Sequence, residues 1–423
     1  MKVTLTPSAP RGKIKAIASK SAAHRLLICA AFADRPTELV CEEINEDISA
    51  TVRCLNALGA KISRKDNLFI VLPVKNLRQS PTLDCGESGS TMRFLVPVVA
   101  ALGCGASFKM SGRLPSRPLS PLREELERHG ITFSEAGSNP LTIEGKIGAG
   151  EYRIRGDVSS QFISGLLFAL SLLEGESRII IEGKTESAPY INMTLDALYE
   201  FGAEPERCDD GFVICCGGNL RSPEKLTVEG DWSGAAFALC AGAISKGAKV
   251  SVCSLDPEST QGDRAIIELL VRFGADVRRK GDCFTVCGGE LCGMEIDASN
   301  IPDLVPILSV VAAAAKGQTV IYGASRLKIK ESDRLSTVTE MLTALGADIS
   351  KTDDGLIING GAPLRGGEVS SCGDHRIAMS AAIAATIAEG EVTIRSAEAA
   401  AKSYPTFWDD IAALGVSIIK EED

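Results

Sequence analysis

Apolar and polar positions along the chain follow a pattern that occurs six times. In each copy a Leu or Ile lies four residues before a Gly, one helical turn back on the same face of a helix. The Gly suits the left-handed position that ends a helix, and the residues after it mostly read as a short strand. This regularity predicts six copies of one structural unit. The glycines, separated by 71, 72, 72, 72 and 69 residues, are Gly59, Gly130, Gly202, Gly274, Gly346 and Gly415.

A second predicted helix recurs at a similar period and is nearly all apolar. Such a helix must be buried on all sides. Each copy nevertheless opens with polar residues, and N-capping of the helix is the simplest explanation for them. If the N-termini converge, their dipoles and free N–H groups would also form a surface that attracts anions. The copies begin near Ser21, Gly89, Ser159, Ser233, Asp303 and Asp374.

The order of elements predicts two domains of three units each. Each unit reads as an apolar helix, a strand, an amphipathic helix and two or more strands. The sixth unit lacks a final strand, and an extra strand near the N-terminus is expected to complete it. One domain is therefore predicted at residues 1–13 and 231–423 and the other at 14–230, with hinge crossings near 10–17 and 228–231. A cleft between them, faced by the buried helix N-termini, is the expected ligand site.

Composition and charge narrow the class of protein. A chain of 423 residues is longer than a domain with a single hydrophobic core usually is, so two domains are expected. Its content of 45% hydrophobic and 24% charged residues is ordinary for a globular protein. A net charge of −10 argues against a nucleic-acid partner. The longest apolar run, residues 305–315, is too short to span a membrane, and the first 20 residues contain no secretory segment. A cytoplasmic protein is expected.

The cysteines and histidines do not indicate a metal site. There are 14 cysteines but no C-x-x-C pair, and only three histidines, so zinc is not expected. In a reducing cytoplasm the cysteines are expected to be free thiols.

Cations and hydroxyl groups concentrate in a few strings. Arg can grip a phosphate or carboxylate with two bonds, whereas Lys supplies a mobile point charge. A lone cation is usually a solvated surface group, but Lys20, Ser21 and Arg25 open a buried apolar helix. The strings are SKSAAHR at 19–25, SGRLPSRPL at 111–119, KIKESDRL at 328–335, CGDHRIA at 372–378 and AKSYP at 401–405.

The spacing within KIKESDRL predicts a helical cluster. Lys330 and Arg334 are four residues apart and would share one face of a helix, with Glu331 at its edge. An ordinary surface cluster of charges is the alternative.

These strings occur in the same order in the 5-enolpyruvylshikimate-3-phosphate synthase family, which the chain resembles over essentially its whole length. The most specific strings are SSQF at 159–162, KESDR at 330–334 and GDHR at 373–376. The resemblance implies an α/β fold, a two-domain inside-out α/β barrel of six repeated units. It implies transfer of the enolpyruvyl group of phosphoenolpyruvate to the 5-hydroxyl of shikimate 3-phosphate, with release of phosphate, in aromatic amino acid biosynthesis. No cofactor or metal is implied, and a monomer is expected.

The resemblance also implies roles for individual residues. Asp303 would be the base for the hydroxyl, and Glu331 and Lys20 would donate and accept protons at the other carbon. Shikimate 3-phosphate would be bound by Lys20, Ser21, Arg25, Ser159, Ser160, Gln161, Ser187, Asp303 and Lys330. Phosphoenolpyruvate would be bound by Lys20, Gly89, Arg117, Gln161, Arg334, Arg376 and Lys402.

Two alternatives remain at this point. The sister family that transfers enolpyruvyl to UDP-N-acetylglucosamine shares the fold. It carries a cysteine in the loop where this chain has SGRLPSRPL, and a Lys-Asn pair where this chain has Lys20 and Ser21. A noncatalytic repeat scaffold of the same fold is the other alternative. The presence of Asp303, Glu331 and Lys20 together argues against it.

Overall fold

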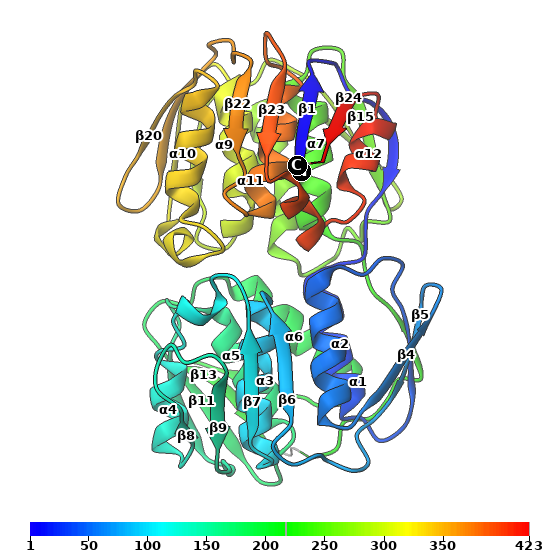
Figure 1. Cartoon of the computed structure of the whole chain (residues 1–423), viewed down its shortest axis with the longest axis vertical. Coiled ribbons are helices and arrows are strands. Elements are labelled where there is room, and N and C mark those ends of the chain that lie inside the picture. The colour runs from blue at the N-terminus through cyan, green and yellow to red at the C-terminus, as the bar shows by residue number, and fades with distance from the viewer. Residues whose placement is uncertain (216–217, 423) are drawn as a thin grey trace. The chain divides into compact units, whose positions relative to one another are not determined.

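The computed structural model describes residues 1–215 and 218–422, and the chain divides into two compact units. The discontinuous unit comprises Met1–Ile17 and Glu229–Asp423, and the continuous unit comprises Ala18–Val228 (Figure 1). Each unit is described by itself below.

The described residues form six four-stranded sheets that share one topology. In each sheet two neighbouring strands run parallel, and the next two strands each run antiparallel to the strand before them. The repeat predicted from the glycine spacing therefore corresponds to one sheet with its two helices.

Three of these sheets belong to the continuous unit, in the orders β14-β3-β5-β4, β6-β7-β9-β8 and β10-β11-β13-β12. The strand β14 comes from the end of this unit and pairs in parallel with β3, where Lys225 lies opposite Glu38. The bounds are β3 (Thr37–Val40), β4 (Lys61–Lys65), β5 (Leu68–Leu72), β6 (Thr82–Gly86), β7 (Ala106–Met110), β8 (Thr132–Phe133), β9 (Leu141–Glu144), β10 (Glu151–Arg155), β11 (Ser177–Glu182), β12 (Glu206–Cys208), β13 (Gly211–Ile214) and β14 (Lys225–Thr227).

The other three sheets belong to the discontinuous unit, in the orders β22-β23-β1-β24, β16-β17-β15-β2 and β18-β19-β21-β20. The N-terminal strand β1 lies between β23 and β24, so it supplies the strand that the sixth repeat lacks. The bounds are β1 (Lys2–Thr6), β2 (Arg11–Lys15), β15 (Lys249–Cys253), β16 (Asp276–Lys280), β17 (Cys283–Cys287), β18 (Glu295–Asp297), β19 (Gly317–Tyr322), β20 (Asp348–Lys351), β21 (Leu356–Gly360), β22 (Gly367–Ser370), β23 (Val392–Arg395) and β24 (Ser417–Glu421).

The six apolar helices are buried and begin within two residues of the predicted starts. Five have a polar side chain that caps the first turn by accepting a backbone N–H, as N-capping predicts. The sixth, α9, is preceded instead by the short helix η3 (Pro302–Leu304). The bounds are α1 (Lys20–Ala31), α3 (Gly89–Leu102), α5 (Ser160–Leu170), α7 (Trp232–Ile244), α9 (Val305–Ala314) and α11 (His375–Ala385). No helix in the described ranges is long and apolar enough to cross a membrane.

The second helix of each repeat ends as its glycine predicts. All six glycines have a positive φ, between 74° and 122°, which L-residues with a Cβ rarely adopt. At Gly59 a Cβ would also lie 2.5 Å from the carbonyl oxygen of Asn76. These helices are α2 (Glu46–Leu58), α4 (Leu122–Arg128), α6 (Ala188–Glu200), α8 (Ile266–Phe273), α10 (Arg334–Ala344) and α12 (Phe407–Ala413).

Each unit has its own hydrophobic core. In the discontinuous unit α7, α9 and α11 pack against one another, and in the continuous unit α3 packs against α5. Most strands alternate between buried and exposed residues, so each sheet covers this helical interior with one face. Helices inside and sheets outside give the α/β arrangement that the resemblance implied.

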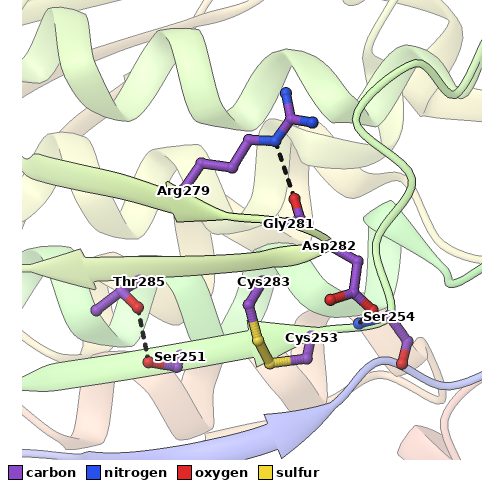
Figure 2. Close-up of a disulfide and its surroundings, with 8 residues drawn as sticks. All are labelled: Ser251, Cys253, Ser254, Arg279, Gly281, Asp282, Cys283 and Thr285. Atoms are coloured by element: carbon purple, nitrogen blue, oxygen red, sulfur yellow. Dashed lines mark hydrogen bonds between the residues drawn. A yellow bond between two sulfur atoms is a disulfide. The ribbon is translucent and has the colours of Figure 1, made fainter.

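One expectation about the cysteines is wrong. Cys253 and Cys283 form a disulfide across β15 and β17 (Figure 2). These strands are antiparallel and Val252 lies opposite Phe284, so the next residues along, Cys253 and Cys283, are directly opposed. The register of the sheet, which residue spacing does not reveal, brings the two thiols together. The described cysteines outside this disulfide are Cys29, Cys41, Cys54, Cys85, Cys104, Cys208, Cys215, Cys240, Cys287, Cys292 and Cys372.

Candidate active site

The start of α1 carries three of the predicted anion-binding residues. Lys20 is the first residue of the helix, and its Nζ donates to Asp47 Oδ2 at 2.9 Å. Arg25 lies one turn later, and burial lowers its pKa to about 10. Its Nη1 donates to the carbonyl oxygen of Ser21 at 2.7 Å, which ties the first turn of α1 to the guanidinium. A cation is therefore held within the protein at a helix N-terminus, where an anion is also favoured.

Arg25 also joins α1 to the start of α6. Its Nε donates to Thr194 Oγ1 and its Nη2 to the carbonyl oxygen of Tyr190, both at 2.8 Å. Ser187, the predicted phosphate contact, immediately precedes α6 in a left-handed conformation with φ of 54°. The structure thus brings Ser187 and Arg25 to the same pair of helices.

The residues predicted to grip phosphoenolpyruvate in the continuous unit also lie together. Gly89 is the first residue of α3, and a Cβ placed on it would lie 2.8 Å from Arg117 Nη1. Gln161, in the first turn of α5, donates from Nε2 to Ser90 Oγ at 2.9 Å. The side chain of Ser159 caps α5, and Ser160 is its first residue. Gly89, Arg117 and Gln161 therefore converge where α3 and α5 begin.

In the discontinuous unit, Arg334 binds three carboxylates. Its Nε donates to Asp374 Oδ2 at 2.9 Å, Nη1 to Asp303 Oδ1 at 2.9 Å, and Nη2 to Glu331 Oε2 at 2.8 Å. The Arg334 side chain is 1% exposed and that of Asp374 is 0% exposed. Burial alone would lower the pKa of Arg334, but the charges of the three carboxylates together raise it. The guanidinium therefore fixes Asp303 and Glu331, the two predicted catalytic carboxylates, relative to each other.

Asp303 is surrounded by cations. Besides Arg334, Arg376 Nη2 lies 3.1 Å from Asp303 Oδ2, and Lys330 Nζ lies 3.6 Å from Oδ1. Arg376 Nη1 also donates to the backbone carbonyl oxygen of Asp303 at 3.0 Å. Burial lowers the pKa of Lys330, an effect that the charge of Asp303 opposes. Lys402 belongs to the neighbouring η5 (Ala397–Lys402), and its Nζ donates to the carbonyl oxygen of Gly373 at 3.1 Å.

The predicted helical cluster at Lys330, Glu331 and Arg334 is wrong in its local structure. The short helix η4 (Ser325–Ile329) ends before Lys330, and α10 begins at Arg334. Asp333 caps α10 by accepting the backbone N–H of Ser336, so the helix begins after Glu331. The three side chains still meet, because Lys330 and Arg334 both reach Asp303 and Glu331 accepts from Arg334.

A family model described as EPSP synthase (3-phosphoshikimate 1-carboxyvinyltransferase) matches residues 6–411 of this chain. The chain belongs to the EPSP synthase family. Curated relatives named 3-phosphoshikimate 1-carboxyvinyltransferase include one from Clostridium perfringens, 43% identical with 100% of both chains covered. Another, from Clostridium kluyveri, is 41% identical with 98% of each covered. The family predicted from the sequence strings is confirmed.

Solved structures agree with the EPSP synthase fold. An EPSP synthase from Acinetobacter baumannii has a TM-score of 0.82 and 28% identity, covering 99% of this chain and 100% of that one. The enolpyruvyl transferase NikO from Streptomyces tendae has a TM-score of 0.77, with 99% and 98% of the two chains covered. At 20% identity the second likeness supports the fold alone. The predicted fold class is confirmed.

Two acidic residues of this EPSP synthase family member were missed by sequence reasoning. Asp374 was read only as the polar start of a helix, yet it is fully buried and binds Arg334. Asp47 was not considered, although it pairs with Lys20 across 27 residues. The signal for Asp374 was present in the GDHR string, since an acidic residue that opens an apolar helix is buried with it. No sequence signal singles out Asp47.

Replacing Gly89 with Ala is expected to weaken phosphoenolpyruvate binding without destabilising the protein. The new Cβ would lie 2.8 Å from Arg117 Nη1 and 3.2 Å from its Cζ, so the guanidinium must move. We expect the KM for phosphoenolpyruvate to rise about tenfold, the equivalent of about 1.4 kcal/mol, while the KM for shikimate 3-phosphate stays nearly constant. Steady-state kinetics measures both. The control is Gly234→Ala in α7, whose Cβ would make an ordinary contact at 3.4 Å. An unchanged KM for phosphoenolpyruvate in Gly89→Ala would contradict the placement of Arg117.

Replacing Asp263 with Asn is expected to stabilise the protein at alkaline pH. Asp263 is 1% exposed, and burial together with the charge of Asp303 raises its pKa to about 7. The folded state therefore holds a proton that the unfolded state releases, so stability falls as pH rises from the unfolded pKa towards 7. We expect Asp263→Asn to exceed the wild type in unfolding free energy by more than about 1 kcal/mol at pH 8, and by much less at pH 4. Denaturant titrations at the two pH values measure this, and a pH-independent difference would contradict it.

Proposed function

We propose that the chain is a 3-phosphoshikimate 1-carboxyvinyltransferase, which transfers the enolpyruvyl group of phosphoenolpyruvate to the 5-hydroxyl of shikimate 3-phosphate. Family membership and the names of relatives 41% and 43% identical over nearly the whole chain support this activity. The structural observation that carries it is the pair Asp303 and Glu331 on one guanidinium. Two carboxyl groups held close together can accept or donate protons at two neighbouring reacting atoms of the substrates.

The cations of each unit suit the two substrates, which are both anions. In the continuous unit, Lys20, Arg25 and the serines at the starts of α5 and α6 would hold shikimate 3-phosphate. Gly89, Arg117 and Gln161 would hold phosphoenolpyruvate where α3 and α5 begin. In the discontinuous unit, Arg334, Arg376 and Lys402 would contact phosphoenolpyruvate, and Lys330 would contact the shikimate ring. Arg side chains suit carboxylate and phosphate oxygens because their donors form a planar fork.

The reaction proceeds by addition and then elimination. Asp303 removes the proton of the 5-hydroxyl of shikimate 3-phosphate while the hydroxyl oxygen bonds to C2 of phosphoenolpyruvate. Glu331 or Lys20 delivers a proton to C3. This gives a tetrahedral intermediate whose C3 is a methyl group. A proton then leaves C3, the bond from C2 to the phosphate oxygen breaks, and phosphate departs. Nearby Arg and Lys side chains stabilise the negative charge on the departing phosphate.

The proposal requires residues of both units to act on the same pair of substrates. The predicted domain boundaries, and hinges near residues 10–17 and 228–231, are part of this proposal. The proposal also includes a monomeric state, a cytoplasmic location, and activity that needs no cofactor, metal, nucleic acid or membrane partner.

An acceptor comparison tests the proposed activity. Purified protein is mixed with phosphoenolpyruvate and either shikimate 3-phosphate or UDP-N-acetylglucosamine, and phosphate release is followed. We expect release only with shikimate 3-phosphate. Release only with the UDP-sugar would favour the sister activity, and no release with either acceptor would favour a noncatalytic protein.

A further inference from the structure

Arg93 is a buried cation beside the predicted phosphoenolpyruvate residues. It lies in α3, one helical turn after Gly89, and is only 4% exposed. Its Nη1 donates to Gln161 Oε1 at 2.8 Å, and its Nη2 donates to the carbonyl oxygen of Pro118 at 3.1 Å. The guanidinium also lies over the ring of Phe162, 5.6 Å from its centre. One side chain thus connects α3, α5 and the loop that carries Arg117.

The contact with Arg93 fixes which way the amide of Gln161 points. Only an acceptor can face a guanidinium, so Oε1 must lie towards Arg93. The other end, Nε2, then donates one of its two N–H groups to Ser90 Oγ at 2.9 Å. The direction of the second N–H is set by these two bonds. A rotated amide would bring its NH₂ group against the donors of Arg93.

The contact with Pro118 fixes the chain immediately after Arg117. Pro118 is the next residue, so holding its carbonyl oxygen restricts where the Arg117 side chain can begin. The far end of that side chain packs on Gly89, where there is no Cβ to displace it. Arg93 therefore positions both Gln161 and Arg117. Gly89, which has no Cβ, leaves room for the guanidinium of Arg117.

We propose that Arg93 is a positioning residue that orients Gln161 and Arg117 towards the carboxylate and phosphate oxygens of phosphoenolpyruvate. This inference rests on the proposed function. Lys cannot replace Arg here, because a single ammonium does not present two donors in a rigid fork to two acceptors on different elements. Loss of the fork should therefore affect one substrate much more than the other.

The test compares Arg93→Lys with a matched control, Arg123→Lys. Arg123 also donates to a backbone carbonyl, that of Ser134 at 2.9 Å, and lies over a ring, that of Phe133 at 5.1 Å. For Arg93→Lys we expect the KM for phosphoenolpyruvate to rise at least about tenfold, the equivalent of about 1.4 kcal/mol. We expect the affinity for shikimate 3-phosphate, measured by calorimetry, to stay within about threefold. Arg123→Lys should leave both near the wild type.

A double-mutant cycle with Gln161→Ala separates positioning from general damage. If Arg93 acts through Gln161, the effect of Arg93→Lys on the KM for phosphoenolpyruvate should shrink in the Gln161→Ala background. Full additivity, an unchanged KM, or equal losses for both substrates would overturn the role of Arg93. An Arg93→Lys protein that does not fold would also overturn it, since the role would then be structural. A folded but inactive wild type would overturn the proposed function itself.

Discussion

Arg334→Met is expected to destabilise the protein by about 3–5 kcal/mol, the range seen when one partner of a buried ion pair is removed. The substitution leaves Asp374 fully buried without its cation, and it also releases Asp303 and Glu331. Burial alone would raise the pKa of Asp374, but the charges of Arg334 and His375, together with the hydrogen bond from Arg334, lower it. Urea or guanidinium unfolding measures the loss. The control is Arg395→Met, which removes an exposed pair with Glu368 and should cost less than about 1 kcal/mol.

The pH dependence of this loss distinguishes charge from packing. In the wild type the lowered pKa of Asp374 means that its contribution to stability is lost as pH falls through the folded pKa. In Arg334→Met the buried carboxylate is expected to have a raised pKa instead, so the variant should become less stable as pH rises. The difference between the two proteins should therefore be larger at pH 8 than at pH 5. An equal difference at both pH values would mean that Arg334 contributes mainly by packing.

Glu331→Gln is expected to lower kcat by about 10²- to 10⁴-fold, the usual contribution of a positioned acid or base. Its amide oxygen can still accept from Arg334 Nη2, which now donates to Glu331 at 2.8 Å, so the fold and the position of Asp303 should be kept. We therefore predict that kcat falls strongly while the affinity for both substrates stays nearly unchanged. Single-turnover kinetics and calorimetry measure the two quantities separately.

The control for this variant is Glu368→Gln, which makes the same chemical change in an exposed ion pair and should leave kcat unchanged. If Glu331→Gln abolished binding of shikimate 3-phosphate, Glu331 would be a structural partner of Arg334. A kcat within about threefold of the wild type would exclude a role in proton transfer.

The repeats and their helices could be predicted from the sequence because their signals are local. A Leu or Ile one helical turn before each Gly marks a helix end, and the period of about 72 residues counts the copies. The starts of the buried helices were also predictable, since capping residues stand directly before apolar runs. The same local reasoning failed at Lys330 and Glu331. Their spacing to Arg334 is compatible with a helix. However, Asp333 caps α10, so the helix begins at Arg334 and excludes Lys330 and Glu331.

Contacts between distant parts of the chain were beyond sequence reasoning. Arg334 was predicted as a ligand-binding cation, and nothing in its spacing shows that carboxylates 31 and 40 residues away lie on its guanidinium. The disulfide of Cys253 and Cys283 depends on the register of two strands. The sequence around Arg93 does not distinguish it from other Arg residues in helices, because its contacts with Gln161 and Pro118 come from other elements. In each case the deciding neighbour comes from another element.

The most direct test of the addition–elimination account is the reaction of the wild-type protein with shikimate 3-phosphate and phosphoenolpyruvate in D₂O. Because C3 becomes a methyl group in the intermediate, a deuteron from the enzyme should enter it before a proton or deuteron leaves. Proton and phosphorus NMR should therefore show phosphate release together with deuterium in the vinyl group of the product. Phosphate release with an undeuterated vinyl group, or no release at all, would contradict the account.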